Sequence, residues 1–251
     1  MIKDCASLVV SNTQVAQQIF CISLKNKELT RRATCGQFVM LEVPGFFLRR
    51  PFCLADIDQK RGQFSLLYAT VGEGTKALSR ISVGQILSVV GPLGQGFEIV
   101  KKKKVLVIAG GLGSAAVMQL CKELIRHNSV DLYLGYKDYQ STIPIEFFPL
   151  GCNTRIATED GSLGTTGLVT TILPEADGYD VIYLCGPLPM YKALLPSLYK
   201  HPKVFASFET RMGCGYGVCA GCSIRVGGKM RKVCHDGPVF LMHEVDLDCL
   251  V

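Results

Sequence analysis

Residues 105–115 read Val105-Leu106-Val107-Ile108-Ala109-Gly110-Gly111-Leu112-Gly113-Ser114-Ala115, and they give the clearest indication of the fold class. The five apolar residues at its start are typical of a strand that is buried on both faces of a parallel sheet. A glycine turn follows, and then a segment with helical apolar periodicity from about Ser114 to His127. A strand, a glycine turn and a helix in this order predict the first unit of a doubly wound α/β domain.

The chain continues with the same alternation of strands and helices as far as about residue 206. We expect further strands at Val130–Gly135, Arg155–Thr158, Val181–Cys185 and Val204–Phe208, and helices near Leu168–Leu173 and Pro189–Tyr199. Repeated βα units predict a doubly wound parallel sheet over residues 101–206.

Residues 1–100 show a different pattern, in which short apolar or alternating runs are broken by turn residues. The runs are Ala6–Val10, Ile19–Leu24, Gln37–Val43, Gln63–Tyr68 and Gln85–Val90. Their length and spacing predict an antiparallel barrel or sandwich, in which only the segment from Gly74 to Ile81 looks helical. We interpret the basic run Lys101–Lys104 as a solvated linker between this domain and the next.

The bulk composition indicates a well-packed globular protein. The chain has 251 residues, 48% of them hydrophobic and 19% charged, with a net charge of +6. The longest apolar stretch, Val105–Met118, is broken by glycines and is too short to span a bilayer, and the first residues lack a secretory apolar region. The lysine run has no aromatic interleaving. We therefore expect a cytoplasmic protein that binds neither membrane nor nucleic acid.

Four cysteines near the C-terminus carry the most specific chemical signal. Cys214, Cys219, Cys222 and Cys234 read C-x4-C-x2-C and then a fourth cysteine after eleven residues. This is the plant-type ferredoxin spacing for a 2Fe–2S cluster. Small residues around the first three allow a tight loop whose backbone N–H groups point at the sulfurs and tune the potential. We place this module at residues 207–251.

Structural zinc and disulfides are the two other uses that four such cysteines could have. Structural zinc usually needs two short cysteine pairs separated by a longer gap, whereas three of these four crowd into nine residues. A disulfide scaffold would have a higher cysteine density. The other eight cysteines stand singly, mostly in apolar stretches, and we expect most of them to be buried thiols.

Two glycine-rich turns follow apolar strands in the α/β domain. Gly110, Gly111 and Gly113 could admit a phosphate to a helix N-terminus, although the full G-x-G-x-x-G fingerprint is missing. Cys185-Gly186-Pro187 follows a second strand, and its cysteine could face a nicotinamide. Each could also be an ordinary turn between a strand and a helix. Ligands of open α/β sheets bind at this edge, so the two turns together favour a dinucleotide site.

Two segments of the first domain could hold a pyrophosphate. Arg49-Arg50-Pro51-Phe52-Cys53 ends a strand, and Val71-Gly72-Glu73-Gly74-Thr75 starts the short helix. Arginine and Gly-Thr backbone groups can bind phosphate. The charges could equally be surface decoration, and the spacing alone leaves both alternatives open.

The order of the motifs resembles that of the ferredoxin-NADP reductase superfamily. The motifs are R-P-x-[S/C], V-G-x-G-T, Gly91–Phe97 (G-P-L-G-Q-G-F), G-G-x-G-x-A and C-G-P-x-P-M. The segments Thr158–Gly164, Glu209–Gly215 and Cys234–Phe240 narrow the match. The whole chain is similar to the electron-transfer subunits of NAD-dependent (class 1B) dihydroorotate dehydrogenases.

This resemblance implies an FAD-binding β-barrel, an NAD-binding doubly wound domain and a C-terminal 2Fe–2S module. It places on FAD the residues Arg50, Pro51, Phe52, Cys53, Leu67, Tyr68, Ala69, Gly74 and Thr75. Two positions depart from the family, which usually has Ser at Cys53, near flavin N5, and Arg at Ala69. A thiol is a weaker donor than a hydroxyl, and Arg49 or Arg50 could replace the lost arginine.

The resemblance also implies the function. A partner subunit would oxidise dihydroorotate at its FMN, and single electrons would cross the 2Fe–2S cluster to FAD, which reduces NAD. The family works in pyrimidine biosynthesis, and we expect a heterotetramer of two plus two subunits. No side chain need act as a catalytic acid, base or nucleophile; Asp160 and Cys185 would position the nicotinamide. After the second parallel strand the only nearby cation is Lys137, which favours NAD over NADP.

Two competing interpretations remain. The hairpin residues Val226-Gly227-Gly228-Lys229 look similar to subunits of a sulfhydrogenase or an NADH-dependent ferredoxin:NADP oxidoreductase. A non-enzymatic zinc module with an incidental nucleotide-like fold is the alternative from another class.

Overall fold

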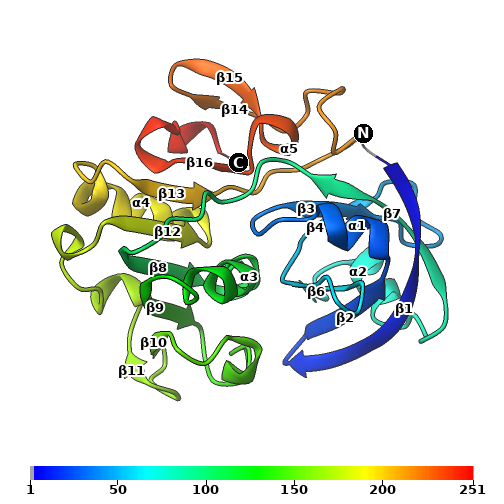
Figure 1. Ribbon diagram of the computed structural model, residues 1–251, viewed down its shortest axis with the longest axis horizontal. Helices are drawn as coiled ribbons and strands as arrows, with labels where there is room; N and C mark the ends of the chain where they lie inside the picture. The colour runs from blue at the N-terminus through cyan, green and yellow to red at the C-terminus, as the bar shows by residue number, and fades with distance from the viewer. Residues whose placement is uncertain (1–2, 251) are drawn as a thin grey trace.

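Two seven-stranded sheets and a short hairpin make up the β-structure of the computed structural model, which describes residues 3–250 (Figure 1). The N-terminal sheet lies at one end of the molecule and the second sheet at the other. The C-terminal residues return to lie across the top of both in the view of Figure 1. The expected combination of an antiparallel β-barrel and a doubly wound α/β sheet is confirmed by this arrangement.

The first sheet is antiparallel and curls around one apolar core. Its strand order is β4-β3-β7-β1-β2-β6-β5. Alternate residues of β7 point inward, which is the pattern of a strand with one buried face. The core contains Leu24, Leu41, Phe64 and Val89. The strands are β1 (Lys3–Ala16), β2 (Ile19–Lys25), β3 (Phe38–Leu41), β4 (Arg50–Cys53), β5 (Asp56–Asp58), β6 (Gln63–Ala69) and β7 (Ile86–Leu93).

The barrel differs from the sequence prediction in two places. The barrel has one helix that the sequence did not predict, α1 (Lys27–Arg32), in addition to the predicted helix, α2 (Glu73–Leu78). Helix α1 has only six residues and no apolar period, so its one sequence signal is the cap residue Asn26, whose Oδ1 accepts from the Leu29 N–H at 2.9 Å. The segment Arg50–Cys53 is itself a strand and not the end of one, because it pairs with β3 throughout.

The second sheet is parallel except at one edge, where β16 runs antiparallel to β13. Its order is β11-β10-β9-β8-β12-β13-β16. Strand β8 is central and is buried from its second residue to its last, as the apolar run predicted. The strands are β8 (Lys104–Gly110), β9 (Ser129–Tyr136), β10 (Asn153–Thr158), β11 (Thr165–Thr166), β12 (Val181–Cys185), β13 (Val204–Ser207) and β16 (Val239–Leu241).

Helix α3 (Ser114–Leu124) joins the two sheets. It is buried on most sides because the parallel sheet lies on one face and the barrel on the other. The Gln119 side chain accepts from the Ile57 N–H of the barrel at 3.0 Å, and Lys122 pairs with Asp56. Contacts from both neighbours therefore fix the barrel against the parallel sheet.

The other helical segments are short apart from α4 (Leu188–Leu198). The helix predicted at Leu168–Leu173 is wrong: the structure has only a single 3₁₀ turn there, η3 (Val169–Thr171), too short for a buried helical face. The remaining 3₁₀ turns are η1 (Gly111–Gly113), η2 (Ile145–Phe147), η4 (Ala176–Gly178), η5 (Met242–Glu244) and η6 (Leu247–Cys249).

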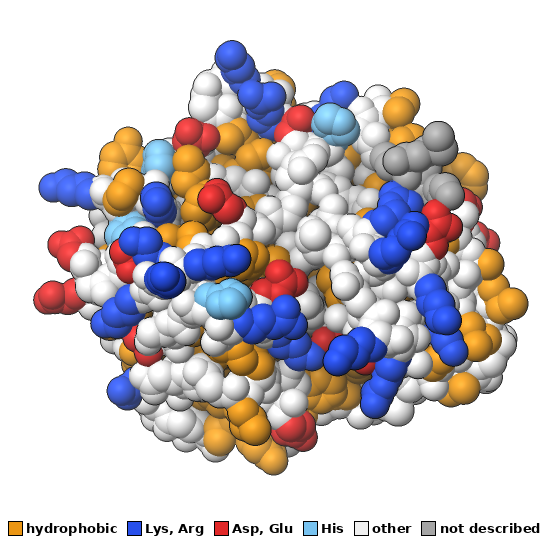
Figure 2. All heavy atoms as spheres, in the orientation of Figure 1, with side chains coloured by type: hydrophobic (Ala, Val, Ile, Leu, Met, Phe, Trp, Pro, Cys, Tyr) orange, Lys and Arg blue, Asp and Glu red, His pale blue; other side chains and the backbone are white. Residues whose placement is uncertain are grey.

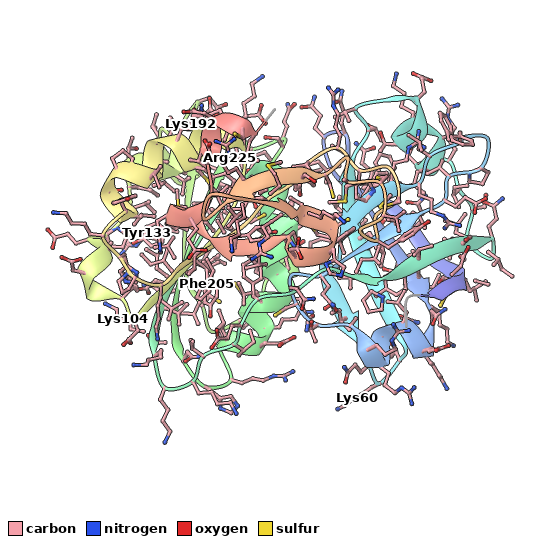
Figure 3. All side chains as sticks on the ribbon, turned by 90° about the horizontal axis from the view of Figure 1, so that it is seen from above. Lys60, Lys104, Tyr133, Lys192, Phe205 and Arg225 are labelled. Atoms are coloured by element: carbon pink, nitrogen blue, oxygen red, sulfur yellow. The ribbon has the colours of Figure 1, made fainter. Side chains whose placement is uncertain are left out.

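The C-terminal segment is tied to the parallel sheet. It contains the hairpin β14 (Ser223–Val226) and β15 (Lys229–Lys232), the short helix α5 (Val233–Asp236), and β16. Figure 3 labels Lys192 of α4 and Arg225 of β14; these side chains pair with Asp248 at 2.7 Å and Asp246 at 3.9 Å. Because β16 extends the parallel sheet, the cluster segment is packed onto the α/β unit.

The basic run contributes to the sheet, which the linker interpretation did not anticipate. Lys104 begins β8, its backbone N–H donates to Asp180, and Lys103 forms an ion pair with Asp180 at 2.9 Å. On the face drawn in Figure 2, Lys and Arg side chains lie in separate groups with acidic side chains between them. Within residues 3–250, no helix is long and apolar enough to cross a membrane.

The cap of α1 gives a test of this local structure. Asn26→Ala removes the bond to the Leu29 N–H and a second bond from Asn26 Nδ2 to the Ala6 carbonyl at 3.1 Å. We expect the free energy of unfolding to fall by about 1 kcal/mol. Urea denaturation measures it, with Asn153→Ala as the control, because this variant removes an exposed side-chain bond to Asp131 but no helix cap. Equal midpoints for Asn26→Ala and the wild type would contradict the cap.

Candidate functional site

A cavity of about 290 Å³ lies between the barrel and the start of α3. Strands β4 and β6 and the start of α2 form its barrel side, and Leu112, Ala115 and Ala116 form the opposite side. Eight of the nine residues that the resemblance assigned to FAD line it: Arg50, Pro51, Phe52, Cys53, Leu67, Tyr68, Ala69 and Thr75. Barrel residues up to 25 positions apart in the sequence thus meet in one cavity, together with Leu112, Ala115, Ala116 and Glu209.

The ninth residue, Gly74, lies directly beside the Arg50 guanidinium. A Cβ atom at Gly74 would be 2.6 Å from Arg50 Nη2, so the absence of a side chain allows the guanidinium to lie against the first turn of α2. Arg50 also stacks over the Phe46 ring at 4.7 Å and donates to the Leu48 carbonyl. Arg50 is therefore held at the edge of this cavity.

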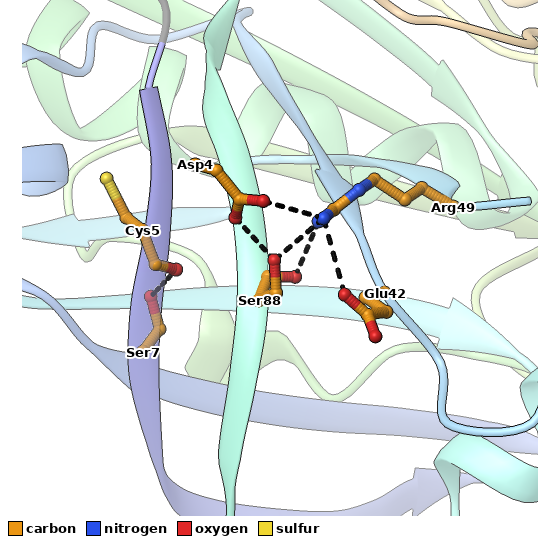
Figure 4. Close-up of polar contacts among 6 residues, drawn as sticks. All are labelled: Asp4, Cys5, Ser7, Glu42, Arg49 and Ser88. Atoms are coloured by element: carbon orange, nitrogen blue, oxygen red, sulfur yellow. Dashed lines mark hydrogen bonds and ion pairs between the residues drawn. The ribbon is translucent and has the colours of Figure 1, made fainter.

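Arg49, by contrast, is committed to a polar network on the outside of the barrel (Figure 4). Its Nη2 lies 2.9 Å from Asp4 Oδ2, 3.3 Å from Glu42 Oε2 and 2.8 Å from Ser88 Oγ. These bonds join the segment before β4 to β1 and β7. Of the two arginines that could replace the family arginine at Ala69, only Arg50 lines the cavity.

A second cavity, of about 240 Å³, lies at the carboxyl ends of β8 and β12. It is lined by both glycine turns: Gly110, Gly111, Leu112 and Gly113 from one, and Cys185, Gly186 and Pro187 from the other. The turns pack closely, because a Cβ at Gly113 would lie 2.6 Å from the Cys185 carbonyl oxygen. Gly111 has φ +54° and open space where its Cβ would be.

A third cavity, of about 390 Å³, continues from the second past Gly110, Gly111 and Pro187. It extends to the ends of β9 and β10, where it is lined by Lys137 and Glu159. The second and third cavities together make an elongated depression along the carboxyl edge of the parallel sheet. That is where open α/β sheets bind dinucleotides.

The structure separates Asp160 from Cys185, although both were expected beside the nicotinamide. Asp160 follows β10, and β9 and β8 lie between β10 and β12 in the sheet. Its carboxylate is exposed and accepts from Ser162 Oγ at 2.6 Å, and it lines none of these cavities. The nicotinamide contact expected for Asp160 stays a prediction, and the sequence alone does not show that two strands lie between β10 and β12.

Glu209 was not predicted as a site residue and belongs in the sequence only to the motif Glu209–Gly215. It follows β13 and lines both the 290 Å³ and the 240 Å³ cavities. Cys53 Sγ donates toward Glu209 Oε1 at 3.9 Å. Partial desolvation raises the pKa of the Glu209 carboxyl, and the Cys53 contact acts in the opposite direction. The available signal was a charged residue directly after an apolar strand, at the sheet edge where ligands bind.

The two thiols beside Glu209 are held in their neutral form. Burial raises the pKa of Cys53, and the nearby Glu209 carboxyl raises it further. Burial also raises the pKa of Cys185, and Glu209 adds to the effect. The thiolate is the nucleophilic form of cysteine, so this environment does not favour nucleophilic catalysis.

The four C-terminal cysteines come together as two pairs. Cys222 Sγ and Cys234 Sγ are 3.2 Å apart, and the Cys219 N–H donates to Cys214 Sγ at 3.4 Å. Across residues 3–250 no three Cys, His, Asp or Glu side chains converge as a single metal ion would require. Two pairs fit a cluster with two irons and two cysteine ligands on each.

Backbone N–H groups point at these sulfurs. Gly217 N donates to Cys234 Sγ at 3.1 Å and Cys234 N to Cys222 Sγ at 3.5 Å. Although burial acts against ionisation, N–H groups from Cys219, Tyr216 and Val218 lower the pKa of Cys214 to about 6. Donors around thiolate sulfur are what an iron–sulfur cluster needs, so the donor set fits the group.

Comparisons with known proteins agree with this geometry. Residues 209–246 match the model for the iron-sulfur cluster binding domain of dihydroorotate dehydrogenase B, and residues 7–98 match an oxidoreductase FAD-binding domain. Dihydroorotate dehydrogenase B (NAD(+)), electron transfer subunit, from Caldanaerobacter subterraneus is 38% identical over 94% of this chain and 96% of its own. The chain belongs to this family of electron transfer subunits. The Lysinibacillus sphaericus member is also 38% identical, over 96% of this chain and 97% of its own.

Solved structures share the fold. A chain of the NADH-dependent reduced ferredoxin-NADP oxidoreductase has a TM-score of 0.89 and 29% identity, over 98% of this chain and 91% of its own. Phthalate dioxygenase reductase has a TM-score of 0.65 at 14% identity, over 89% of this chain and 86% of its own. The protein is therefore a flavin and iron–sulfur oxidoreductase subunit, and the zinc-module alternative is wrong.

The close packing of the two turns can be tested by adding one methyl group. Gly113→Ala places a Cβ against the Cys185 carbonyl, which is backbone and cannot rotate away. We expect a loss of about 1–3 kcal/mol in the free energy of unfolding, the range for overpacking. Gly178→Ala is the control, since its Cβ would meet only the flexible Lys104 Nζ at 3.9 Å. Equal stability of the two variants in urea would show that the turns can separate at no cost.

Proposed function

We propose that this chain carries electrons between a dihydroorotate-oxidising catalytic subunit and NAD, within pyrimidine biosynthesis in the cytoplasm. The observation that supports this most directly is the junction of the cavities. Glu209 and Leu112 line both the first cavity (the barrel cavity, about 290 Å³) and the second cavity (the glycine-turn cavity, about 240 Å³). Ligands bound in these two cavities would therefore meet beside these residues. An oxidoreductase that passes a hydride between a flavin and a nicotinamide needs this contact.

The chain is proposed to act as three units. Residues 1–100 hold FAD, residues 101–206 hold NAD, and residues 207–251 hold the 2Fe–2S cluster. The last boundary cuts close to the end of β13, and β16 returns to the same sheet. That pairing supports a cluster unit that moves with the NAD unit.

The FAD site is proposed to consist of the barrel residues around the first cavity. Arg50 would pair with the pyrophosphate beside Gly74 and Thr75, and Tyr68 and Phe52 would flank the ring system. Tyr68 is buried and held by Asn12 at 2.9 Å, and its ring packs 5.7 Å from that of Phe52. These aromatic side chains are therefore positioned before the cofactor arrives.

The NAD site is proposed to run along the second and third cavities. Gly110, Gly111 and Gly113 would allow the pyrophosphate to approach the backbone, and Cys185, Gly186 and Pro187 would form the nicotinamide end. The flavin, when bound, exchanges single electrons with an iron–sulfur centre and a hydride with nicotinamide. The protein groups bind, orient and exclude water, and no side chain is assigned a catalytic role.

The cluster site is proposed to use Cys214, Cys219, Cys222 and Cys234. Its loop reaches the surface: Cys219 is exposed, and Val218 and Tyr216 expose 74% and 45% of their area. Apolar side chains around an exposed cluster ligand support a docking surface for the partner. The name of the family, electron transfer subunit, implies a catalytic partner; we propose that it contains FMN and that the complex has two copies of each chain.

A second function is favoured by one comparison. The structure with a TM-score of 0.89 belongs to an NADH-dependent reduced ferredoxin-NADP oxidoreductase. Copurification from the native host distinguishes the two. A dihydroorotate-oxidising flavoprotein bound to the chain supports the first proposal, and a larger ferredoxin-linked flavoprotein supports the second.

The cluster assignment is tested by Cys219→Ser, because an alcohol is a poor replacement for a thiolate ligand. We expect iron content and the visible iron–sulfur absorption to fall, while FAD stays bound in the other unit. NADH oxidation with an artificial two-electron acceptor should survive, and NAD reduction linked to the partner should fail. Cys249→Ser, another exposed cysteine, is the matched control. Wild-type iron content and coupled rate in Cys219→Ser would refute the assignment.

The choice between NAD and NADP is tested at Glu159. Glu159 lines the third cavity at the ends of β9 and β10, where we propose that the adenosine of the dinucleotide lies. A carboxylate there would repel the 2′-phosphate of NADP. Lys137 is the only cation that lines this cavity. Glu159→Gln should tighten NADP binding by about tenfold, roughly 1.4 kcal/mol, and leave NAD binding within about twofold. Glu175→Gln serves as a control outside the cavity. Titrations in which neither affinity changes would place the ribose elsewhere.

A further inference from the structure

The two peptide groups that flank Gly217 point their N–H groups at different cysteine pairs. The Gly217 N–H donates to Cys234 Sγ at 3.1 Å. The Val218 N–H, in the next peptide group, is one of the backbone donors to Cys214 Sγ. Cys234 and Cys214 belong to different pairs, because Cys234 lies against Cys222 and Cys214 against the Cys219 N–H. The position of Gly217 therefore sets one donor to each pair.

The carbonyl of Gly217 accepts a hydrogen bond from a lysine of the hairpin. Lys232 Nζ lies 2.6 Å from this oxygen. Lys232 is the last residue of β15, directly before α5, and its backbone N–H donates to Asp236 Oδ2 at 2.8 Å (Figure 1). The Gly217 carbonyl and the Val218 N–H belong to one planar peptide group and point in opposite directions. The ammonium is thus bonded to one end of a peptide group whose other end faces Cys214.

The ammonium of Lys232 is half-buried and is not neutralised by a direct ion pair. Among the residues that the structure describes, Lys232 takes part in none of the ion pairs. The nearby Asp236 carboxylate is occupied by the Lys232 backbone N–H and by His235 Nδ1. A charged donor on a carbonyl polarises the peptide group, which strengthens the bond that its N–H makes.

The loop at Gly217 is also held by close packing against α5. A Cβ atom at Gly217 would lie 3.1 Å from His235 Cβ. Its φ of +88° is a conformation that glycine adopts readily and other residues rarely. Because packing holds the loop as well, we expect it to keep its place when a neutral side chain of similar length replaces Lys232.

We propose that Lys232 is a positioning residue that raises the reduction potential of the 2Fe–2S centre, by binding the Gly217 carbonyl and placing a positive charge one peptide group from Cys214. The inference rests on the proposed function, which places the cluster on the four cysteines. Taking up one electron adds one negative charge to the cluster and its thiolates, with no bond formed or broken. A fixed positive charge and stronger N–H donors favour this more negative state.

Lys232→Met tests the proposal, because methionine keeps most of the length of the side chain and removes its charge. In the full chain with FAD and cluster bound, the equilibrium constant for one-electron reduction of the cluster should fall about tenfold. This is a fall of about 59 mV in a one-electron midpoint potential. A redox titration followed by the EPR signal of the reduced cluster measures the potential without the partner or NAD.

Two variants separate the effect of this charge from a general change in surface charge. Lys229→Met is the matched control, since it removes the same charge from an exposed residue of the same strand. Lys232→Arg keeps the charge at the bonded position. Both should keep the wild-type potential. If Lys232→Met does not retain the cluster, Lys232→Gln, which is neutral but keeps a hydrogen-bond donor, takes its place.

The outcomes are distinct from those that test the proposed function. If the wild-type chain takes up no 2Fe–2S cluster from iron and sulfide, the proposed function fails. If the cluster is present and the neutral variant keeps the wild-type potential, only this inference fails. An equal fall in Lys229→Met would also overturn it, because a distant surface charge would then have the same effect. Loss of iron with an unchanged potential of the remaining cluster would make Lys232 a purely structural residue.

Discussion

Contact between the two glycine turns at the carboxyl edge of the parallel sheet is the constraint on which the site depends. A Cβ atom at Gly113 would come within 2.6 Å of the Cys185 carbonyl oxygen, and a Cβ atom at Gly110 would lie 3.0 Å from Pro187 Cδ. Backbone packed on backbone leaves little freedom for either turn. The ends of β8 and β12 are therefore fixed relative to each other, and the second cavity lies above both.

Helix α3 extends this constraint to the barrel. It begins directly after the first glycine turn, with the Ser114 hydroxyl bonded to the Gly111 carbonyl at 2.8 Å. Its first turn forms part of the barrel cavity, and its last turns are bonded to β5 through Gln119 and Lys122. Two cofactors bound on different units would consequently be presented to each other at one junction, beside Glu209. Fixed proximity of this kind lowers the entropic cost of hydride transfer.

The two positions at which the sequence is expected to depart from the family pattern have distinct surroundings in the structure. Cys53 lies between the barrel cavity and Glu209, and its raised pKa keeps the thiol protonated as a weak donor. Ala69 leaves Arg50 as the arginine that lines the barrel cavity, because Arg49 is held by Asp4, Glu42 and Ser88 on the outer face. Arg50 thus lies on the cavity side of the barrel, whereas Arg49 bonds the segment before β4 to strands β1 and β7.

The strands of the parallel sheet and the fold class follow from the sequence, because they depend on local apolar period, and the cluster ligands are predicted from short spacing. The apolar run of β8, the glycine turn and the C-x4-C-x2-C loop are such features. Two features depend on the tertiary structure: Glu209 stands at the junction of the first two cavities, and Asp160 lies two strands from β8. Each of these depends on the order of strands in the sheet and on contacts between residues far apart in the chain, which no local pattern records.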